Sequence, residues 1–159
     1  MNEDLQSKFR LLILDLLGLP DGYVRSADIT QPTEGDRYII VQFNIVNPVG
    51  QHGTTHENNI QTVYQNSEIT VTLDFFGHDA FTLASTLPNA FRSSVGTYGL
   101  DEIGLGFLKA NEARNLSALE LDRITRYQAN YLFSVVSNFS SPLSTLDTVS
   151  IGIQVDRNF

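Results

Sequence analysis

The residues best suited to chemistry in this chain are its three histidines, His52, His56 and His78. His52 and His56 are four positions apart and Glu57 follows, a spacing that on a helix would place two imidazoles on one face as zinc ligands. The surrounding glycine, threonine and asparagine residues are poor helix formers, so this geometry is not expected. We interpret both histidines as exposed residues of a polar loop and keep a zinc-dependent hydrolase using His52, His56 and Glu57 as an alternative.

His78 and Asp79 lie where a predicted strand passes into a predicted helix, a common position for catalytic groups. A Gly-x-Ser-x-Gly nucleophile motif is missing there, and Asp79 is the residue type that caps a helix N-terminus. Gly104-Leu105-Gly106 lacks the third glycine of a dinucleotide-binding turn, and no phosphate-binding Gly-Lys-Ser/Thr sequence occurs. The chain also has no cysteine. These patterns predict a protein without catalytic residues, cofactor or metal.

Composition narrows the function classes further. The 159 residues are 42% hydrophobic and 18% charged, with a formal net charge of −8 and no cluster of Lys and Arg. A protein that neutralises DNA phosphates would show a basic surface, so DNA binding is not expected as the main function. The chain has no uninterrupted apolar run of about 20 residues and no basic N-terminal segment, which predicts a cytoplasmic product that does not enter a membrane.

Hydrophobic periodicity predicts the elements that must position these residues. We expect one domain over residues 1–159, beginning with an amphipathic helix over residues 2–17 that Asn2 caps. A second helix is expected from Asp79 to Phe91, kinked or ended at Pro88. Residues 94–106 are expected to be irregular. Strands are expected over residues 24–29, 37–46, 68–76, 107–111, 126–137 and 149–155. The predicted fold class is α+β, a mainly antiparallel mixed sheet with both helices packed on one face.

Two segments stand out from this pattern. Residues 47–61 are almost entirely polar and are predicted to form a long loop or arm between two strands. In residues 68–76, Ile69, Val71, Leu73 and Phe75 alternate with Glu68, Thr70, Thr72 and Asp74, which predicts a half-buried strand with one polar face.

The sequence Asp74-Phe75-Phe76-Gly77, with Ala80 and then Arg92 at the end of the following helix, resembles the neck and tail-terminator proteins of contractile-tailed phages. Asn115-Leu116-Ser117 followed by Arg126, and Arg37-Tyr38-Ile39 at the start of a strand, are similar to further segments of that family.

The resemblance implies a structural protein of the virion at the tail–neck junction, made in the host cytoplasm. Such a protein forms a ring, most simply a hexamer, that ends the tail tube and binds the neck or connector proteins and the sheath. The DNA passes through the lumen without specific binding. On this reading the subunit interface comprises two groups of residues, His52, His56, Glu57 and Asn59 in the arm, and Glu68, Thr70, Thr72 and Asp74 on the polar sheet face. Another neck or head-completion protein and a small soluble binding module are the alternatives.

Overall fold

The computed structural model describes residues 3–27, 37–117 and 125–143. Its helices are α1 (Glu3–Leu17), α2 (Ala80–Arg92) and α3 (Ser94–Glu102). Its strands are β1 (Val24–Ser26), β2 (Tyr38–Pro48), β3 (Gly53–Glu57), β4 (Ile60–Phe76), β5 (Leu105–Ala110), β6 (Arg114–Asn115) and β7 (Arg126–Pro142). The predicted strand at 149–155 and the proposed cap Asn2 lie outside the described residues.

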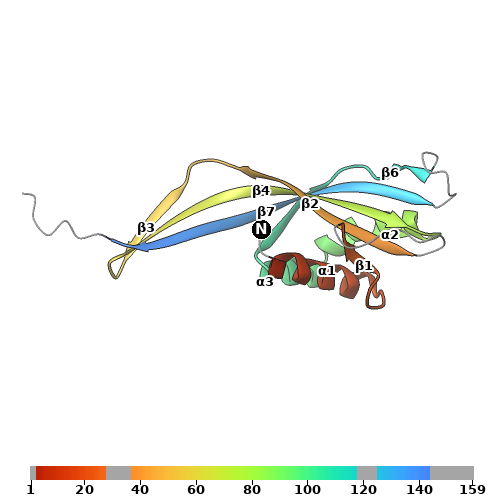
Figure 1. The fold of residues 1–159 in the computed structure, drawn as a ribbon, viewed down its shortest axis with the longest axis horizontal. Helices are drawn as coiled ribbons and strands as arrows, with labels where there is room; N and C mark the ends of the chain where they lie inside the picture. Colours follow the sequence, from red (N-terminus) through yellow and green to blue (C-terminus); the bar gives the residue numbers. More distant parts are fainter. Residues whose placement is uncertain (1–2, 28–36, 118–124, 144–159) are drawn as a thin grey trace, which may run out of the picture.

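The strands form one sheet in the order β1-β2-β4-β7-β5, with β3 paired to β4 and β6 paired to β7. All pairings are antiparallel except the short parallel pair of β1 and β2. Figure 1 shows the helices gathered under one face at one end of the sheet, while β3 and parts of β4 and β7 extend well beyond them. The predicted α+β class with a mainly antiparallel sheet is confirmed.

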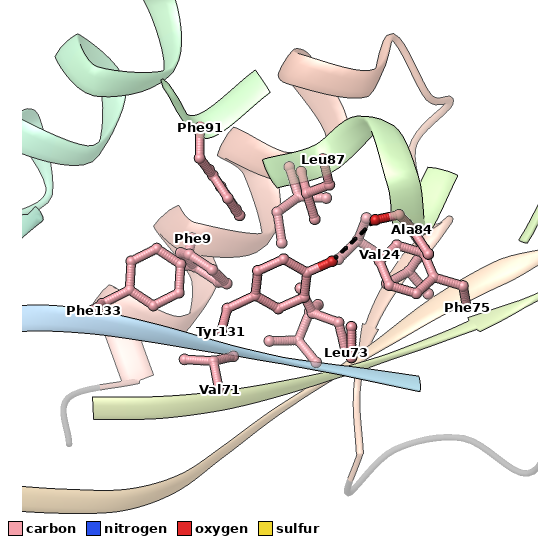
Figure 2. Packing of buried hydrophobic residues seen from close by; sticks show 14 of the residues in the cluster. Phe9, Val24, Val71, Leu73, Phe75, Ala84, Leu87, Phe91, Tyr131 and Phe133 are labelled. Carbon is pink, nitrogen blue, oxygen red and sulfur yellow. Dashed lines mark hydrogen bonds between the residues drawn. The ribbon is translucent and has the colours of Figure 1, made fainter. Parts of the chain in front are cut away.

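The core lies between this sheet face and the three helices. Phe9 from α1, Phe91 from α2 and Phe133 from β7 are almost fully buried and contact one another, with ring centroids 5.2–6.0 Å apart. Alternation along β4 places Val71 and Leu73 in the core, both fully buried. Figure 2 shows these side chains converging on the ring of Tyr131. The apolar face that helical spacing creates on α1 and the apolar face that alternation creates on β4 therefore pack together in one cluster.

Helix α2 agrees with the prediction to within one residue at each end, but its N-terminus is not capped as expected. It does not end at Pro88 but continues to Arg92. Asp79 precedes its first residue yet makes no side-chain capping hydrogen bond, because its carboxylate binds the guanidinium of Arg37 instead. The proline removes the N–H that would bind the carbonyl of Ala84 one turn earlier. The buried hydroxyl of Tyr131 donates to that carbonyl at 3.5 Å, as the dashed line in Figure 2 marks.

The prediction that residues 94–106 are irregular was wrong, since most of them form α3. Ser93 caps this helix by accepting a hydrogen bond from the N–H of Gly96 at 3.1 Å. The glycines that argued against a helix allow close packing instead. A Cβ on Gly96 would lie 2.0 Å from the carbonyl oxygen of Ala90, and one on Gly99 would lie 2.5 Å from a methyl carbon of Leu12.

Candidate assembly surface

The part of the sheet that extends beyond the helices is the candidate functional site, and we name it the arm. It consists of β3, residues 60–66 of β4 and residues 136–142 of β7 (Figure 1). The prediction of a long polar loop over residues 47–61 was therefore wrong in its secondary structure. β2 extends to Pro48, and β3 and β4 form a hairpin in place of the loop.

The hairpin turn is formed by Asn58 and Asn59, whose φ angles are 50° and 61°. Positive φ at both central residues is typical of the two-residue turn that matches the twist of antiparallel strands, and asparagine tolerates it better than most residues. The N–H of Leu143 donates to the carbonyl of Asn59 at 2.8 Å. The end of β7 is thereby joined to the tip of the arm.

Pairing along the arm is regular. β4 and β7 pair over 17 residues each without a register shift, so the arm and the body share two unbroken strands. Thr62 and Ser140 lie opposite each other and their hydroxyls are 2.8 Å apart. Gly53 lies under the ring of Tyr64, where a Cβ would meet the ring at 2.0 Å. These contacts make the arm a continuation of the sheet.

The arm exposes apolar side chains on both faces. Phe139 is 71% exposed and lies opposite Val63, on the face of β4 that helices cover further along the strand. Ile60, Tyr64 and Val136 are 47%, 38% and 59% exposed and share the other face by register. Exposed apolar groups gathered on one projecting element indicate a contact surface.

The arm is also almost free of charge. Residues 58–66 and 136–143 contain no Asp, Glu, Lys or Arg, and β3 adds only Glu57. This is unusual in a chain whose formal net charge is −8. Apart from Glu57, the charged residues that the structure describes lie outside the arm, so the arm and the body differ in the surfaces they present.

On the polar face predicted for β4, Thr72 and Asp74 form their hydrogen bonds with other residues of the same chain. Asp74 is 7% exposed and accepts hydrogen bonds from Arg126 and from Gln128, both at 3.1 Å. The hydroxyl of Thr72, 8% exposed, donates to the side-chain oxygen of Asn130 at 2.7 Å and accepts from Asn44. These hydrogen bonds join neighbouring strands of the body, and they leave little exposed surface on Thr72 or Asp74 for contact with another subunit.

A separate ion pair joins the start of β2 to the start of α2. The guanidinium of Arg37 donates to both carboxylate oxygens of Asp79. This hydrogen bonding holds the pKa of Asp79 below its ordinary value of 3.8, and burial opposes it less strongly. The pair fastens the turn at Gly77, whose φ of 112° puts its backbone against Arg37.

The helical layer carries a second apolar surface, between α1 and α3, which we name the α1–α3 groove. Leu11, Val95 and Tyr98 are 60%, 62% and 66% exposed there, and the groove has a volume of about 620 Å³. Leu12 and Gly99, in close contact, lie in the groove where the two helices meet. Hydrogen bonding to the Glu102 carboxylate raises the pKa of Tyr98, which keeps its phenol neutral.

The residues predicted as an interface fall into two groups. His52, His56, Glu57 and Asn59 are exposed in or next to the arm. Glu68, Thr70, Thr72 and Asp74 lie further along β4 and are half-buried or buried. Within the described ranges, no three His, Asp or Glu side chains are close enough together to hold a metal ion. Nor is any described helix long and apolar enough to cross a membrane.

Sequence reasoning missed the apolar part of this surface. Phe139, Tyr64 and the α1–α3 groove were not predicted as contact residues. For the arm a signal was present, because Ile60, Thr62 and Tyr64 alternate with Gln61, Val63 and Gln65 after the Asn58-Asn59 pair. The groove gave no signal in the sequence, since it depends on how two helices pack.

Comparison with known proteins identifies a family that matches nearly the whole chain. The family described as "Phage neck terminator protein" matches residues 3–158. A comparison with curated proteins gave no match. Among solved structures, a chain of the "Virion of native gene transfer agent (GTA) particle" is similar at 14% identity, over 84% of this chain and 92% of that chain. Its TM-score of 0.33 is too low to establish a common fold.

Proposed function

Because the chain belongs to the phage neck terminator protein family, we propose that it assembles into a closed ring, most simply a hexamer, at the head–tail junction. There the ring ends the tail tube and provides the docking surface for the neck. As a member of this family the chain is a structural component of the phage neck. The family match over residues 3–158 carries the proposal.

The shape and surface of the arm are the structural argument for the ring. A closed ring repeats one head-to-tail contact, in which two different surfaces of the same chain meet. The arm extends about 25 Å from Ser67 to the hairpin tip, at roughly 3.3 Å per residue. It is stiffened by the continuous pairing of β4 and β7 and exposes Phe139 and Val136. An element with this reach and apolar surface can cross a subunit boundary.

The charge of the chain suits a passage for DNA. With a formal net charge of −8, a ring of identical subunits repels phosphate groups and leaves DNA free to slide. Tight duplex binding with a steep salt dependence would contradict this part of the proposal.

The proposal is tested by light scattering and negative-stain imaging of the purified protein, alone and with its tail tube protein. We expect ring-shaped oligomers and, in the mixture, tubes capped at one end. A protein that stays monomeric in both conditions would overturn the ring.

A variant pair tests the arm. Phe139→Asp places a charge on its most exposed apolar residue, and Thr86→Asp adds the same charge at an exposed site on α2. We expect the first variant to remain folded by circular dichroism and to lose the ring, and the second to keep both. Rings of unchanged stability in the Phe139→Asp variant would remove the arm from the interface.

A further inference from the structure

We propose that the arm of one subunit docks in the α1–α3 groove of the next subunit, with Phe139 as its main apolar contact. This inference rests on the proposed ring and names the acceptor of the arm. Two exposed apolar surfaces of different shape, one projecting and one concave, are what a head-to-tail contact between identical chains requires.

The arm cannot occupy the groove of its own chain. β4 and β7 run from the body to the tip as two paired strands without a register shift. Folding back would break this pairing, since a sheet of this length twists but does not reverse. Figure 1 shows the arm directed away from α1 and α3. An arm that docks in this groove therefore comes from another molecule.

Charge favours a second copy as that molecule. Asp15 and Glu102 line the groove, and its one lysine, Lys8, is paired with Asp4 at 2.8 Å. An acidic chain meeting a copy of itself is repelled wherever two acidic surfaces approach. Because residues 58–66 and 136–143 have no charged side chain, the β4 and β7 segments of the arm approach this acidic rim without that repulsion, and Glu57 in β3 is the one carboxylate of the arm.

The groove also has the apolar content that the arm needs. Leu11 and Val95 are exposed by 60% and 62% in the free chain and lie on two different helices. Interface cores are typically aromatic side chains seated among aliphatic ones, with polar groups around them. Phe139 between Leu11 and Val95, with Asp15 and Glu102 at the rim, matches that arrangement.

A second groove at the root of the arm is the competing acceptor. It has a volume of about 670 Å³ and exposes Leu108, 47% exposed, beside Val136. Part of its wall is formed by β4 and β7 of the same chain. An arriving arm would lie against the arm already there, whereas the α1–α3 groove is formed by helices alone.

Cysteine crosslinking tests the proposal, because the chain has no cysteine of its own. Three double variants are compared after treatment with a short bismaleimide, each containing Phe139→Cys. The second change is Val95→Cys in the proposed groove, Leu108→Cys in the competing groove, or Phe81→Cys, which is 61% exposed on α2. We expect a ladder of covalent oligomers up to the full ring for Val95→Cys and none for the other two.

The outcomes separate the two levels of the proposal. Oligomers by light scattering without a ladder at Val95→Cys would overturn the docking site and leave the proposed ring intact. A ladder at Leu108→Cys would move the arm to the competing groove. Monomers throughout, with or without the tail tube protein, would overturn the ring and the docking together.

A substitution pair gives a second measurement independent of crosslinker geometry. Val95→Asp adds a charge inside the groove, and Thr86→Asp adds one at an exposed site outside it. We expect Val95→Asp to lower the oligomer fraction at least tenfold with an unchanged circular dichroism spectrum. Equal oligomer fractions in the two variants would contradict docking in the groove.

Discussion

Tyr131 donates a hydrogen bond to a carbonyl of helix α2. We predict that this hydroxyl replaces the helical N–H donor that Pro88 lacks. Tyr131 is fully buried, and burial raises the pKa of its phenol, which therefore remains a neutral donor across the accessible pH range. Its oxygen is 3.5 Å from the carbonyl oxygen of Ala84. Removing the hydroxyl by Tyr131→Phe leaves that carbonyl in the core with neither partner.

The loss of stability expected for Tyr131→Phe follows from the length of this hydrogen bond and from its burial. A neutral hydrogen bond contributes about 0.5–1.5 kcal/mol, and a buried carbonyl left unsatisfied costs about 1–3 kcal/mol. Because 3.5 Å is long for an O–H donor, we expect the low end, about 1 kcal/mol for Tyr131→Phe. Pro88→Ala supplies an N–H four residues after Ala84, so in that background Tyr131→Phe should cost almost nothing. The predicted coupling is about 1 kcal/mol.

Chemical unfolding of the four proteins of this cycle measures the coupling, with thermal unfolding as a second readout. A change of 1 kcal/mol corresponds to about 2–4 °C in a chain of this size. Pro88→Ala alone should be neutral or stabilising, since proline is about 3 kcal/mol worse than alanine inside a helix and constrains the unfolded chain by about 0.4–1 kcal/mol. If Tyr131→Phe costs the same in both backgrounds, the hydroxyl is not replacing the missing N–H.

Two further predictions concern the packing of α3 and the start of α2. Gly96→Ala should destabilise the fold by about 2–3 kcal/mol, because its methyl would meet a backbone oxygen of α2. Gly99→Ala should be near neutral, because the side chain of Leu12 can turn aside. Equal unfolding midpoints for the two variants would contradict this difference. Asp79→Asn should destabilise at neutral pH through loss of Arg37 binding. The pKa of Asp79 is lowered by folding, so its contribution is present above 3.8 and is lost as the pH falls through the folded value. The two proteins should therefore converge in stability at low pH, as urea titrations at several pH values would show.

The body of the fold could be predicted from the sequence because its signals are local. Phe9 and Ile13 recur at helical spacing, and Val71, Leu73 and Phe75 alternate with polar residues, so each pattern identifies its buried face. In the structure these faces meet in one cluster. The period of the apolar residues determines which face of a helix or strand is buried. Burial of these faces then determines that the helices pack on this side of the sheet.

Helix α3 and the strands of the arm were missed because tertiary contacts outweigh local preference there. Gly96 and Gly99 lower helix propensity by about 1 kcal/mol each, yet close packing against the backbone of α2 requires Gly96, and Gly99 leaves room for the side chain of Leu12. The arm has few apolar residues because much of it faces no core, so the composition of residues 47–61 is that of a loop. Its strand β3 pairs with β4, and β4 pairs in turn with β7, which is distant in the sequence. Packing against α2 and pairing with β7 cannot be seen in a short sequence window, whereas the alternation from Ile60 to Gln65 was a local signal for the hairpin.

The predicted interface residues were chosen for polarity, and for two of them polarity has a role within the chain. Thr72 and Asp74 are polar because they form hydrogen bonds between neighbouring strands of one chain. His56 and Asn59 do lie in the arm, where an interface remains a prediction. An exposed Phe139 is the more specific indicator, because an apolar side chain that is 71% exposed gains nothing from its position until a partner covers it.

A small contact per subunit has a consequence for how the proposed ring assembles. An arm formed by three short strand segments buries little area on its own, so a single arm–groove contact is expected to be weak. An open chain of subunits has one contact fewer than it has subunits, and the closing contact is intramolecular, with an effective concentration in the millimolar range. Closure therefore stabilises the ring far more than any intermediate. Sedimentation velocity over a concentration series should show monomers and closed rings, with dimers and trimers scarcely populated. A stable dimer as the main species would point instead to a twofold contact between identical surfaces, which neither closes a larger ring nor uses the arm and the groove together.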